Sequence, residues 1–318
     1  MNIFTPKKLT RSYIEIFESL GFTISKQAKD IILPFGENSN KDLELYINSP
    51  EIKYSLQFPD LYLLAKKTEL WMNMLNFWGL QKTLKYLPQT YILNTKKDET
   101  TINTLSSSSN KKFIAKGNKQ RRQTIKIIDA HEIQDLLNSK DFRLIQEIID
   151  SRNIINRRAF NIRMFLIFTY SDSTFKSYVS SNGKLIYSNN SENMISQTDF
   201  YDESLPLLLY DLFSDKFDIN RKRFYSQLKD LCKAVSKMYE ARINNKKLIG
   251  GKSFCQLFGI DLILDQNHQL KLLEINNRPQ IKSNNFRDQS FKNSVFRDCT
   301  NHFLLKKDKP TIEWIETY

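Results

Sequence analysis

The stretch from Phe254 to Pro279, FCQLFGIDLILDQNHQLKLLEINNRP, decides the fold class and the candidate site of this chain. Its segments IDLILD and LKLLEIN are two apolar runs, and the polar residues 265–269 between them predict a turn. The pattern therefore predicts two adjacent strands in which Asp261 and Glu274 lie opposite each other. Glu274 and Asn276 are two residues apart, so we expect their side chains to point to the same face of the strand.

These three residues form a candidate metal site. Hard oxygen donors on one face of a sheet, within an otherwise apolar sequence, suit a divalent metal ion that also binds phosphate oxygens. The alternative is a polar sheet face exposed to solvent, because acidic residues on strands are common. The residues by themselves leave both interpretations open.

The same block resembles the C-terminal signature of the tubulin–tyrosine ligase family, the ATP-grasp enzymes that add amino acids to tubulin tails. That family has a Gly-x-Asp strand, then a Leu-Leu-Glu-x-Asn strand and a proline. The matching residues are Gly259, Asp261, Leu272, Leu273, Glu274, Asn276 and Pro279. The resemblance implies that Asp261, Glu274 and Asn276 hold Mg²⁺ against the phosphates of ATP.

Other blocks resemble the family and follow in its order from about Phe58 to about Thr300, and this collinearity is stronger evidence than one motif. FPDLYLLAKKTELWMNM and YLPQTYILN match a Phe-Pro segment, a Lys-x-x-Leu helix and a Pro-x-Thr strand, and FRDCTN matches a late helix. KKFIAKG places Lys116 at the position of the first nucleotide-contacting lysine. RRAFNIRMFLIF places Arg163 at the closing arginine of a Phe-Asp-Ile-Arg strand.

The segment LIQEIID resembles the part of the family that lines the adenine pocket. The resemblance implies that Gln146, Glu147 and Ile148 contact the nucleotide. It also implies ATP and Mg²⁺ as cofactors and a reaction in which a carboxylate is phosphorylated before an amine attacks the acyl phosphate. Arg163 would steady the transferred group or the tetrahedral intermediate. The alternative for Arg163 is a structural ion pair with Asp261 or Glu274 across the sheet.

The fold that the resemblance implies is a mixed α/β, ATP-grasp fold. We expect a small N-terminal βα subdomain at residues 1–57, a central subdomain at 58–140 and a C-terminal subdomain with the metal site at 141–318. The nucleotide would lie between the last two.

Apolar side chains at helical spacing predict a helix after Thr10, a helix from Lys67 to Leu80 and a long amphipathic helix with an apolar stripe from Phe224 to Met238. The polar, serine-rich residues 95–112 predict a surface loop, and residues 188–204 predict a connection of low order. The sequence shows no internal repeat.

Several positions depart from the family pattern. Ala159 stands where the family has a lysine, Asn161 where it has an aspartate, and Ile186 where it has an arginine that helps to bind the acceptor or the amino acid. We expect the nearby Arg157 or Arg158 to supply the missing positive charge, although only one of them can share a strand face with Ala159. Arg158 is the one expected to contact the nucleotide. The segment after Lys116, GNKQRRQTI, has one glycine and three cationic side chains. The alternative is therefore a catalytically reduced relative that binds tubulin or another acidic partner without ligation.

Composition narrows the class of partner. The chain of 318 residues has 40% hydrophobic residues and a net charge of +13, so it can bury a core and attract polyanions. Acidic protein tails such as those of tubulin fit this charge. A solvated, lysine-rich surface without a partner also explains it, and a nucleic-acid-binding protein is the weakest alternative because charge alone supports it.

The remaining sequence features predict the setting of the protein. No apolar run approaches the length of a membrane span, and the N-terminus lacks the pattern of a signal peptide. Cys232, Cys255 and Cys299 are odd in number and lack metal-type spacing, which favours reduced thiols in the cytoplasm. We expect a monomer that uses a free amino acid as substrate, with possible association with the cytoskeleton left open.

Overall fold

A computed structural model describes residues 1–34, 39–93, 111–117, 125–137, 139, 141–152, 154–155, 157–190, 200–243 and 251–318. The predicted polar loop at 95–112 lies almost wholly outside these residues. So do the cationic side chains from Lys119 to Arg122 and most of the connection at 188–204.

The larger of two sheets has the strand order β14-β10-β9-β12-β4-β3-β1-β2, with β11 also paired to β9 and β13 to β12. Its strands are β1 (Asn2–Phe4), β2 (Thr23–Ser25), β3 (Asp30–Ile32), β4 (Ile52–Ser55), β9 (Phe160–Ser171), β10 (Thr174–Ser180), β11 (Lys184–Tyr187), β12 (Ser253–Leu264), β13 (Leu270–Asn276) and β14 (Trp314–Glu316). The smaller sheet has the order β5-β8-β6-β7. Its strands are β5 (Thr90–Ile92), β6 (Lys112–Gly117), β7 (Ile125–Asp129) and β8 (Phe142–Glu147).

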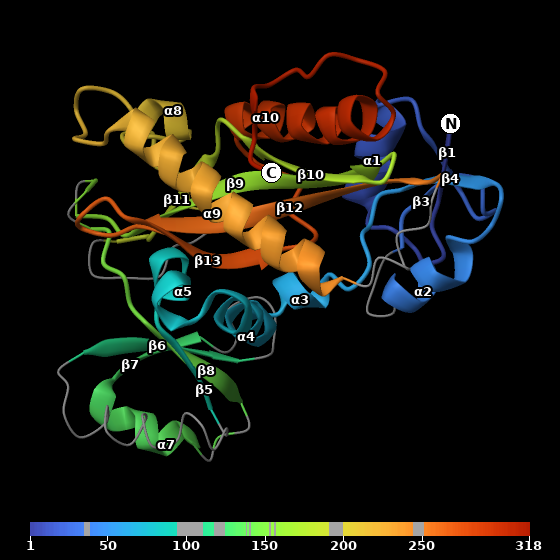
Figure 1. Cartoon of the computed structure of the whole chain (residues 1–318). Coiled ribbons are helices and arrows are strands. Elements are labelled where there is room, and N and C mark those ends of the chain that lie inside the picture. Colours follow the sequence, from blue (N-terminus) through green and yellow to red (C-terminus); the bar gives the residue numbers. More distant parts are fainter. Residues whose placement is uncertain are drawn as a thin grey trace.

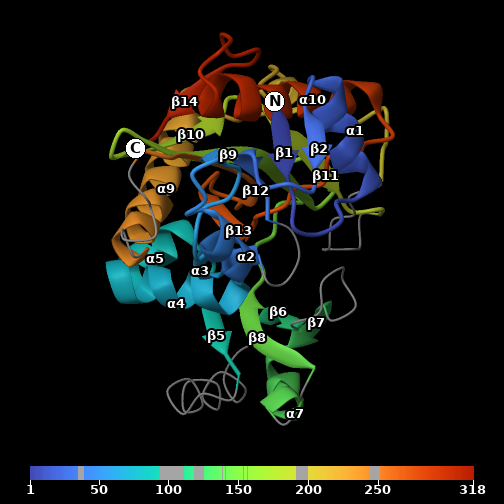
Figure 2. The ribbon, with the colours of Figure 1, turned by 90° about the vertical axis from the view of Figure 1, so that its right-hand side faces the viewer.

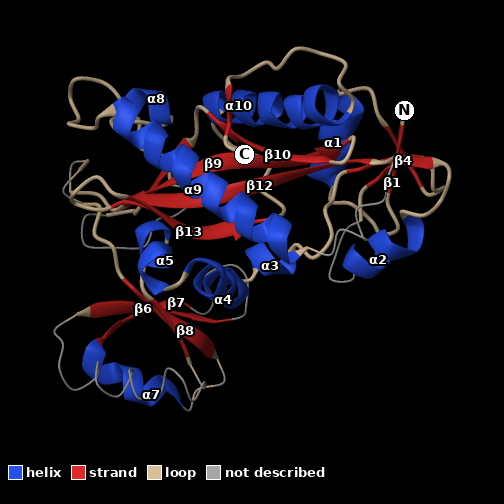
Figure 3. Ribbon diagram, viewed as in Figure 1, coloured by secondary structure: helices blue, strands red, loops and turns tan. Residues whose placement is uncertain are grey.

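Helices are interspersed with the strands along the chain (Figure 3). They are α1 (Arg11–Ser19), α2 (Ser39–Tyr46), α3 (Tyr62–Ala65), α4 (Lys67–Trp78), α5 (Leu80–Tyr86), α7 (Ile133–Leu137), α8 (Leu209–Leu212), α9 (Arg221–Arg242) and α10 (Phe286–Arg297), with a 3₁₀ turn η1 (Ala130–Glu132) and a π-helical segment η3 (Asp298–Leu304). The predicted mixed α/β class is confirmed. Among the described residues, no helix is both long and apolar enough to cross a membrane.

Helices cover both faces of the larger sheet (Figure 1). Strand β12 is buried on both sides, and alternate side chains enter two different apolar clusters. Phe254 and Phe258 pack in the cluster that contains the buried face of α9. Cys255 and Leu257 pack in the cluster that contains α1 and α10. This two-sided burial explains why FCQLFGIDLIL is almost continuously apolar.

The smaller sheet lies beyond α4 and α5, away from α10 and the chain's N-terminus (Figures 1 and 2). It has an apolar cluster of its own, which includes Phe113, Ile128 and Ile145. β8 pairs with β5 and β6 in this sheet, although it follows residue 140 in the chain. The predicted division at residues 57 and 140 stays a prediction.

The predicted helix from residue 67 to 80 ends at Trp78, and a second helix follows it directly. Gly79 separates them with a φ of 74°, a left-handed conformation that favours glycine. The apolar periodicity of the sequence continues across this glycine, which is why the pattern predicted one helix. The break turns α5 toward β13, where Lys271 Nζ donates to the backbone oxygen of Lys85 at 3.1 Å.

Asp298 anchors the C-terminal segment to the end of α10. Its side chain is 1% exposed, and its two oxygens accept from Thr311 N at 2.7 Å, Thr311 Oγ1 at 2.7 Å, Ile312 N at 3.1 Å and Trp314 Nε1 at 2.8 Å. We expect Asp298→Asn to lower the free energy of unfolding by about 2 kcal/mol. The asparagine side chain has an NH₂ group in place of one accepting oxygen, so some of the four donors would lose their acceptor. Urea denaturation measures this. The exposed Asp308→Asn is the control, and an equal loss in both variants would contradict the anchor.

Candidate functional site

The predicted hairpin is confirmed. β12 pairs with β13 in antiparallel register, with Asp261 opposite Glu274 and Gly259 opposite Asn276. Asn276 Nδ2 donates to Glu274 Oε1 at 3.1 Å, so these two side chains share a face as the sequence indicated. The register shifts by one residue directly after Asp261, and such a bulge re-aims side chains at the point where it occurs.

On its other side β12 pairs with β9, and this pairing brings Arg163 opposite Asp261. The guanidinium binds the carboxylate in two places, from Nε to Oδ1 and from Nη2 to Oδ2 at 2.8 Å. Gly259 makes room for the arginine, since a Cβ at this position would lie 3.3 Å from Arg163 Cδ and 3.1 Å from Pro279 Cβ. The glycine of the Gly-x-Asp motif therefore serves close packing beside the carboxylate.

The smaller sheet contributes a second polar group. Lys116 on β6 is 8% exposed, and its Nζ donates to Gln146 Oε1 on β8 at 2.6 Å. Gln146 Nε2 in turn donates to Thr90 Oγ1 on β5 at 2.9 Å. Three of the four strands of this sheet, β5, β6 and β8, thus hold one buried ammonium group in a fixed position.

A small cavity joins this group to the larger sheet. Its lining comes from α4, from β5, β6 and β8 of the smaller sheet, and from β13. The lining residues include Lys67, Trp71, Lys116, Leu144, Gln146 and Leu273. Lys67 lines this cavity and forms an ion pair with Glu274, so the cavity adjoins one of the candidate metal ligands.

Two cationic side chains, Lys67 of α4 and Lys116 of β6, act on the carboxylate of Glu274. Lys67 Nζ lies 3.2 Å from Glu274 Oε2. Burial by itself disfavours the ionised carboxylate, but Lys67, Lys116 and the amide of Asn276 together lower the pKa of Glu274 to about 2. Burial raises the pKa of Asp261, and the neighbouring Glu274 adds to the rise while Arg163 opposes it.

Lys116 is the buried cation of the site. Burial lowers its pKa to about 8, although the carboxylates of Glu274 and Asp261 favour the charged form and Lys67 disfavours it. Lys67, Lys116 and Arg163 against Asp261 and Glu274 leave one excess positive charge. The arrangement therefore favours an added anion over a bare cation.

The donor set fits magnesium in the company of phosphate. Within the described part of the chain, no group of three or more His, Cys, Asp or Glu side chains is placed to hold a metal ion. Two carboxylates and the oxygen of Asn276 are an incomplete shell for a permanently bound metal. Mg²⁺ commonly takes one or two carboxylates and completes its shell with water and substrate phosphates, so the residues fit a metal–nucleotide complex.

Three other predicted residues lie outside this cluster of contacts. Glu147 forms an ion pair with Lys111 at 2.7 Å, and the backbone N–H of Ile148 donates to Lys112 O at 3.4 Å. Arg158 Nη1 donates to Ser188 O at 3.3 Å, and its guanidinium lies 5.5 Å from the ring centre of Phe200. Their roles at a nucleotide stay predictions.

Several charged residues near the site had no expected role from the sequence. Lys67 belongs to the Lys-x-x-Leu motif, and this motif could have marked it as a candidate site residue. Lys184 lies opposite Arg163 on β11, and both Lys184 Nζ and Lys292 Nζ lie 3.1 Å from the buried Asp288 Oδ2. Asp288 helps to keep Arg163 charged against the effect of burial. No motif in the sequence brings these three segments together.

The positions that depart from the family pattern are also located. Ala159 and Ile186 are buried, at 6% and 4% exposure, and Ile186 lies opposite Asn161 across β11 and β9. The backbone oxygen of Ala159 accepts from Ser188 N at 2.8 Å. An apolar side chain therefore fills each of two positions where the family carries a cation.

A family model for the tubulin-tyrosine ligase family matches residues 47–191 and 208–311, which include every residue of the site described above. The chain belongs to the tubulin-tyrosine ligase family. It is 25% identical over 278 residues to tubulin polyglutamylase ttll-4 of Caenorhabditis briggsae, across 77% of this chain and 45% of the relative. It is 25% identical over 276 residues to tubulin monoglutamylase TTLL4 of Mus musculus, across 77% of this chain and 23% of the relative. The chain thus spans less than half the length of either relative.

Substitution of Arg163 tests how much its two-point ion pair with Asp261 contributes to the free energy of unfolding. We expect Arg163→Lys to lower the free energy of unfolding by about 1.5 kcal/mol, because lysine cannot bind both oxygens of Asp261 in the planar geometry of arginine. Chemical denaturation measures the loss. Arg242→Lys, at an exposed position on α9, is the matched control and should stay within 0.5 kcal/mol or so of the parent.

Proposed function

We propose that this chain is an ATP-dependent ligase that forms an amide bond between an amino acid and an acidic protein tail. The observation that carries the proposal is the meeting of two groups from different sheets. Asp261, Glu274 and Asn276 lie on adjacent strands of the larger sheet, and the buried Lys116 of the smaller sheet acts electrostatically on both carboxylates. The proposed fold is an ATP-grasp fold with the nucleotide between these parts.

Each site residue would have a role that follows from the chemistry of its side chain. Asp261, Glu274 and Asn276 would hold Mg²⁺, while Lys116 and Lys67 would neutralise phosphate oxygens. Bound Mg-ATP would supply a phosphoryl group that turns an unreactive carboxylate into an acyl phosphate open to attack by an amine. Arg163, kept in place by Asp261, would stabilise negative charge that develops on the reacting group.

Gln146 would have two tasks. It orients the ammonium group of Lys116 through its Oε1 and is itself fixed through Thr90. Together with Glu147, Ile148 and Arg158, it belongs to the proposed nucleotide-binding set. The division into subdomains at residues 57 and 140 is part of the same proposal.

The proposed acceptor is a tubulin tail, and glutamate is the first amino acid to test, since both relatives are named tubulin glutamylases. A net charge of +13 supports an acidic partner by long-range attraction. We propose a cytoplasmic, microtubule-associated site of action. The buried Ala159 and Ile186 favour one second candidate, a relative that binds the tail and nucleotide without ligation.

Incubation with tubulin, ATP, Mg²⁺ and isotope-labelled amino acids tests the proposal, with mass spectrometry of the tails as readout. We expect a mass increase that requires ATP and is greatest with glutamate. Absence of any addition from all twenty amino acids, together with measurable ATP binding, would favour the non-ligating relative. Absence of both would remove the proposed function.

A further inference from the structure

A second cavity lies between the N-terminal elements and the end of α10, on the segment that follows the metal-ligand strand β13. Asn277, Arg278 and Pro279 form one side of it. Apolar residues supply much of the remaining lining, namely Phe17, Leu33, Leu56, Leu257 and Phe296. The residues of the proposed nucleotide site, Lys116, Asp261 and Glu274, do not line it.

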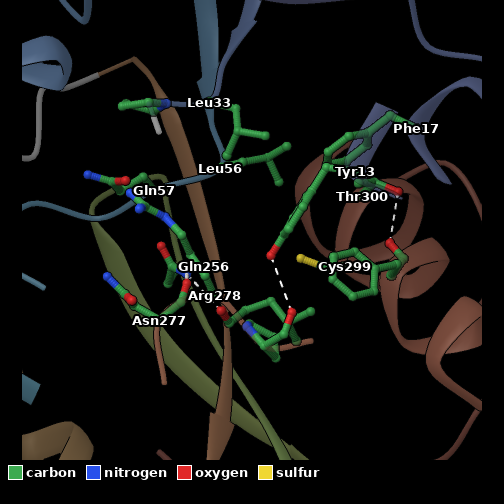
Figure 4. Close-up of a pocket in the computed structure, with 14 residues that line it drawn as sticks. Tyr13, Phe17, Leu33, Leu56, Gln57, Gln256, Asn277, Arg278, Cys299 and Thr300 are labelled. Carbon is green, nitrogen blue, oxygen red and sulfur yellow. Dashed lines mark hydrogen bonds between the residues drawn. The ribbon is translucent and has the colours of Figure 1, made fainter. Parts of the chain in front are cut away.

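Two buried glutamines give this cavity its polar character. Gln57 is 2% exposed and Gln256 is 5% exposed. Figure 4 shows both on one side of the cavity, across from Tyr13, Phe17 and Cys299. Within the described residues, Gln57 Nε2 and Gln256 Oε1 are buried atoms that have no hydrogen-bond partner. A buried polar atom without a hydrogen-bond partner costs folding free energy, so each of these two atoms calls for an explanation.

The orientation of Gln256 is fixed by its other bonds. Its Nε2 donates to Leu257 O at 2.7 Å and to Asn277 O at 3.0 Å, which leaves Oε1 as the acceptor without a partner. A flipped side chain would lose both of these bonds. The cavity therefore offers an acceptor without a partner at Gln256 Oε1 and a donor without a partner at Gln57 Nε2. Its lining also includes apolar residues and the polar side chains of Tyr13, Asn277, Arg278 and Thr300.

We propose that this cavity binds a small amide carried on an apolar body. The N–H of such a ligand would donate to Gln256 Oε1, and its carbonyl oxygen would accept from Gln57 Nε2. A ketone has no proton for Gln256, and a hydrocarbon leaves both glutamine atoms without partners. The ligand would lie next to Asn277, whose carbonyl oxygen accepts a hydrogen bond from Gln256 Nε2. Asn277 directly follows Asn276, one of the candidate metal ligands.

Benzamide is the probe, with acetophenone and toluene as chemical controls. We expect a dissociation constant of about 1 mM for benzamide by ligand-observed NMR, without ATP, and binding at least tenfold weaker for both controls. Gln57→Leu removes a donor that has no partner in the fold, so the variant should fold and bind benzamide about fivefold or more weakly. The exposed Gln81→Leu makes the same chemical change elsewhere and should leave binding unchanged.

A crystal soaked with benzamide gives the second readout. Density for the ring among the apolar residues, with the amide between Gln57 and Gln256, would support the proposal. Water alone in the cavity, or equal affinity for benzamide and toluene, would overturn it. The result is independent of the proposed ligase, because no measurement uses ATP, tubulin or turnover.

Discussion

Glu274→Gln is expected to lower the rate of ATP-dependent ligation by about a thousandfold, because it removes the negative charge from one of two carboxylates proposed to hold Mg²⁺. Glutamine keeps the shape of the side chain and an oxygen for the hydrogen bond from Asn276. Mg-ATP binding by calorimetry should weaken in parallel. ATP binding without Mg²⁺ should change far less, since the lost ligand acts through the metal.

The stability of this variant separates loss of the metal from loss of the fold. The pKa of Glu274, lowered to about 2, means that its ionised carboxylate stabilises the folded state, so the variant should lose about 2 kcal/mol of the free energy of unfolding at pH 7. A single urea transition with the slope of the parent would show that the fold survives this loss. Glu51→Gln, at an exposed position, is the matched control for the charge change. Full activity of Glu274→Gln would remove the carboxylate from the proposed metal site.

Lys116 should make nucleotide binding depend on pH in the alkaline range. Burial lowers its pKa from the usual 10.5 to about 8, so between these values the unfolded chain binds more protons than the folded one. Folding stability from this group therefore rises with pH across that window and is lost as the pH falls toward 8. Phosphate oxygens would favour the charged ammonium, so ATP affinity should fall up to tenfold per unit as the pH rises above 8.

Calorimetry in buffers of different ionisation enthalpy tests this behaviour. Binding of Mg-ATP at pH 8.5 should take up a proton, and Lys116→Met should abolish that uptake. The variant should bind about thirtyfold more weakly at pH 7, because a hydrogen bond to a charged group contributes about 2 kcal/mol. Lys112→Met, at an exposed position of the same strand, should keep both the affinity and the uptake. Equal behaviour of the two variants would contradict the role of Lys116.

Local patterns predicted much of the fold. The hairpin with Asp261 opposite Glu274, the helix after Thr10 and the apolar stripe of α9 all follow from spacing within one segment, and the structure confirms them. Such features depend on strand and helix periodicity, which a sequence displays directly. The break at Gly79 was missed because apolar periodicity continues on both sides of it.

Contacts between distant segments could not be predicted in this way. Arg163 and Asp261 are 98 residues apart, and the sequence offered their ion pair only as an alternative to a catalytic arginine. The contact of Lys67 with Glu274 requires α4 to lie beside β13. No periodicity encodes that placement, because it depends on how whole elements pack.

The sequence by itself determined the family, the mixed α/β class and the three oxygen donors of the candidate metal site, since these depend on residue order and local geometry. Only the tertiary structure decided which cations neutralise those donors and where Ala159 and Ile186 lie. It also decided that Gln57 and Gln256, 199 residues apart in the numbering, share one cavity. The physical reason is that burial and charge pairing act through space, and the packing of the two sheets sets the distances over which they act.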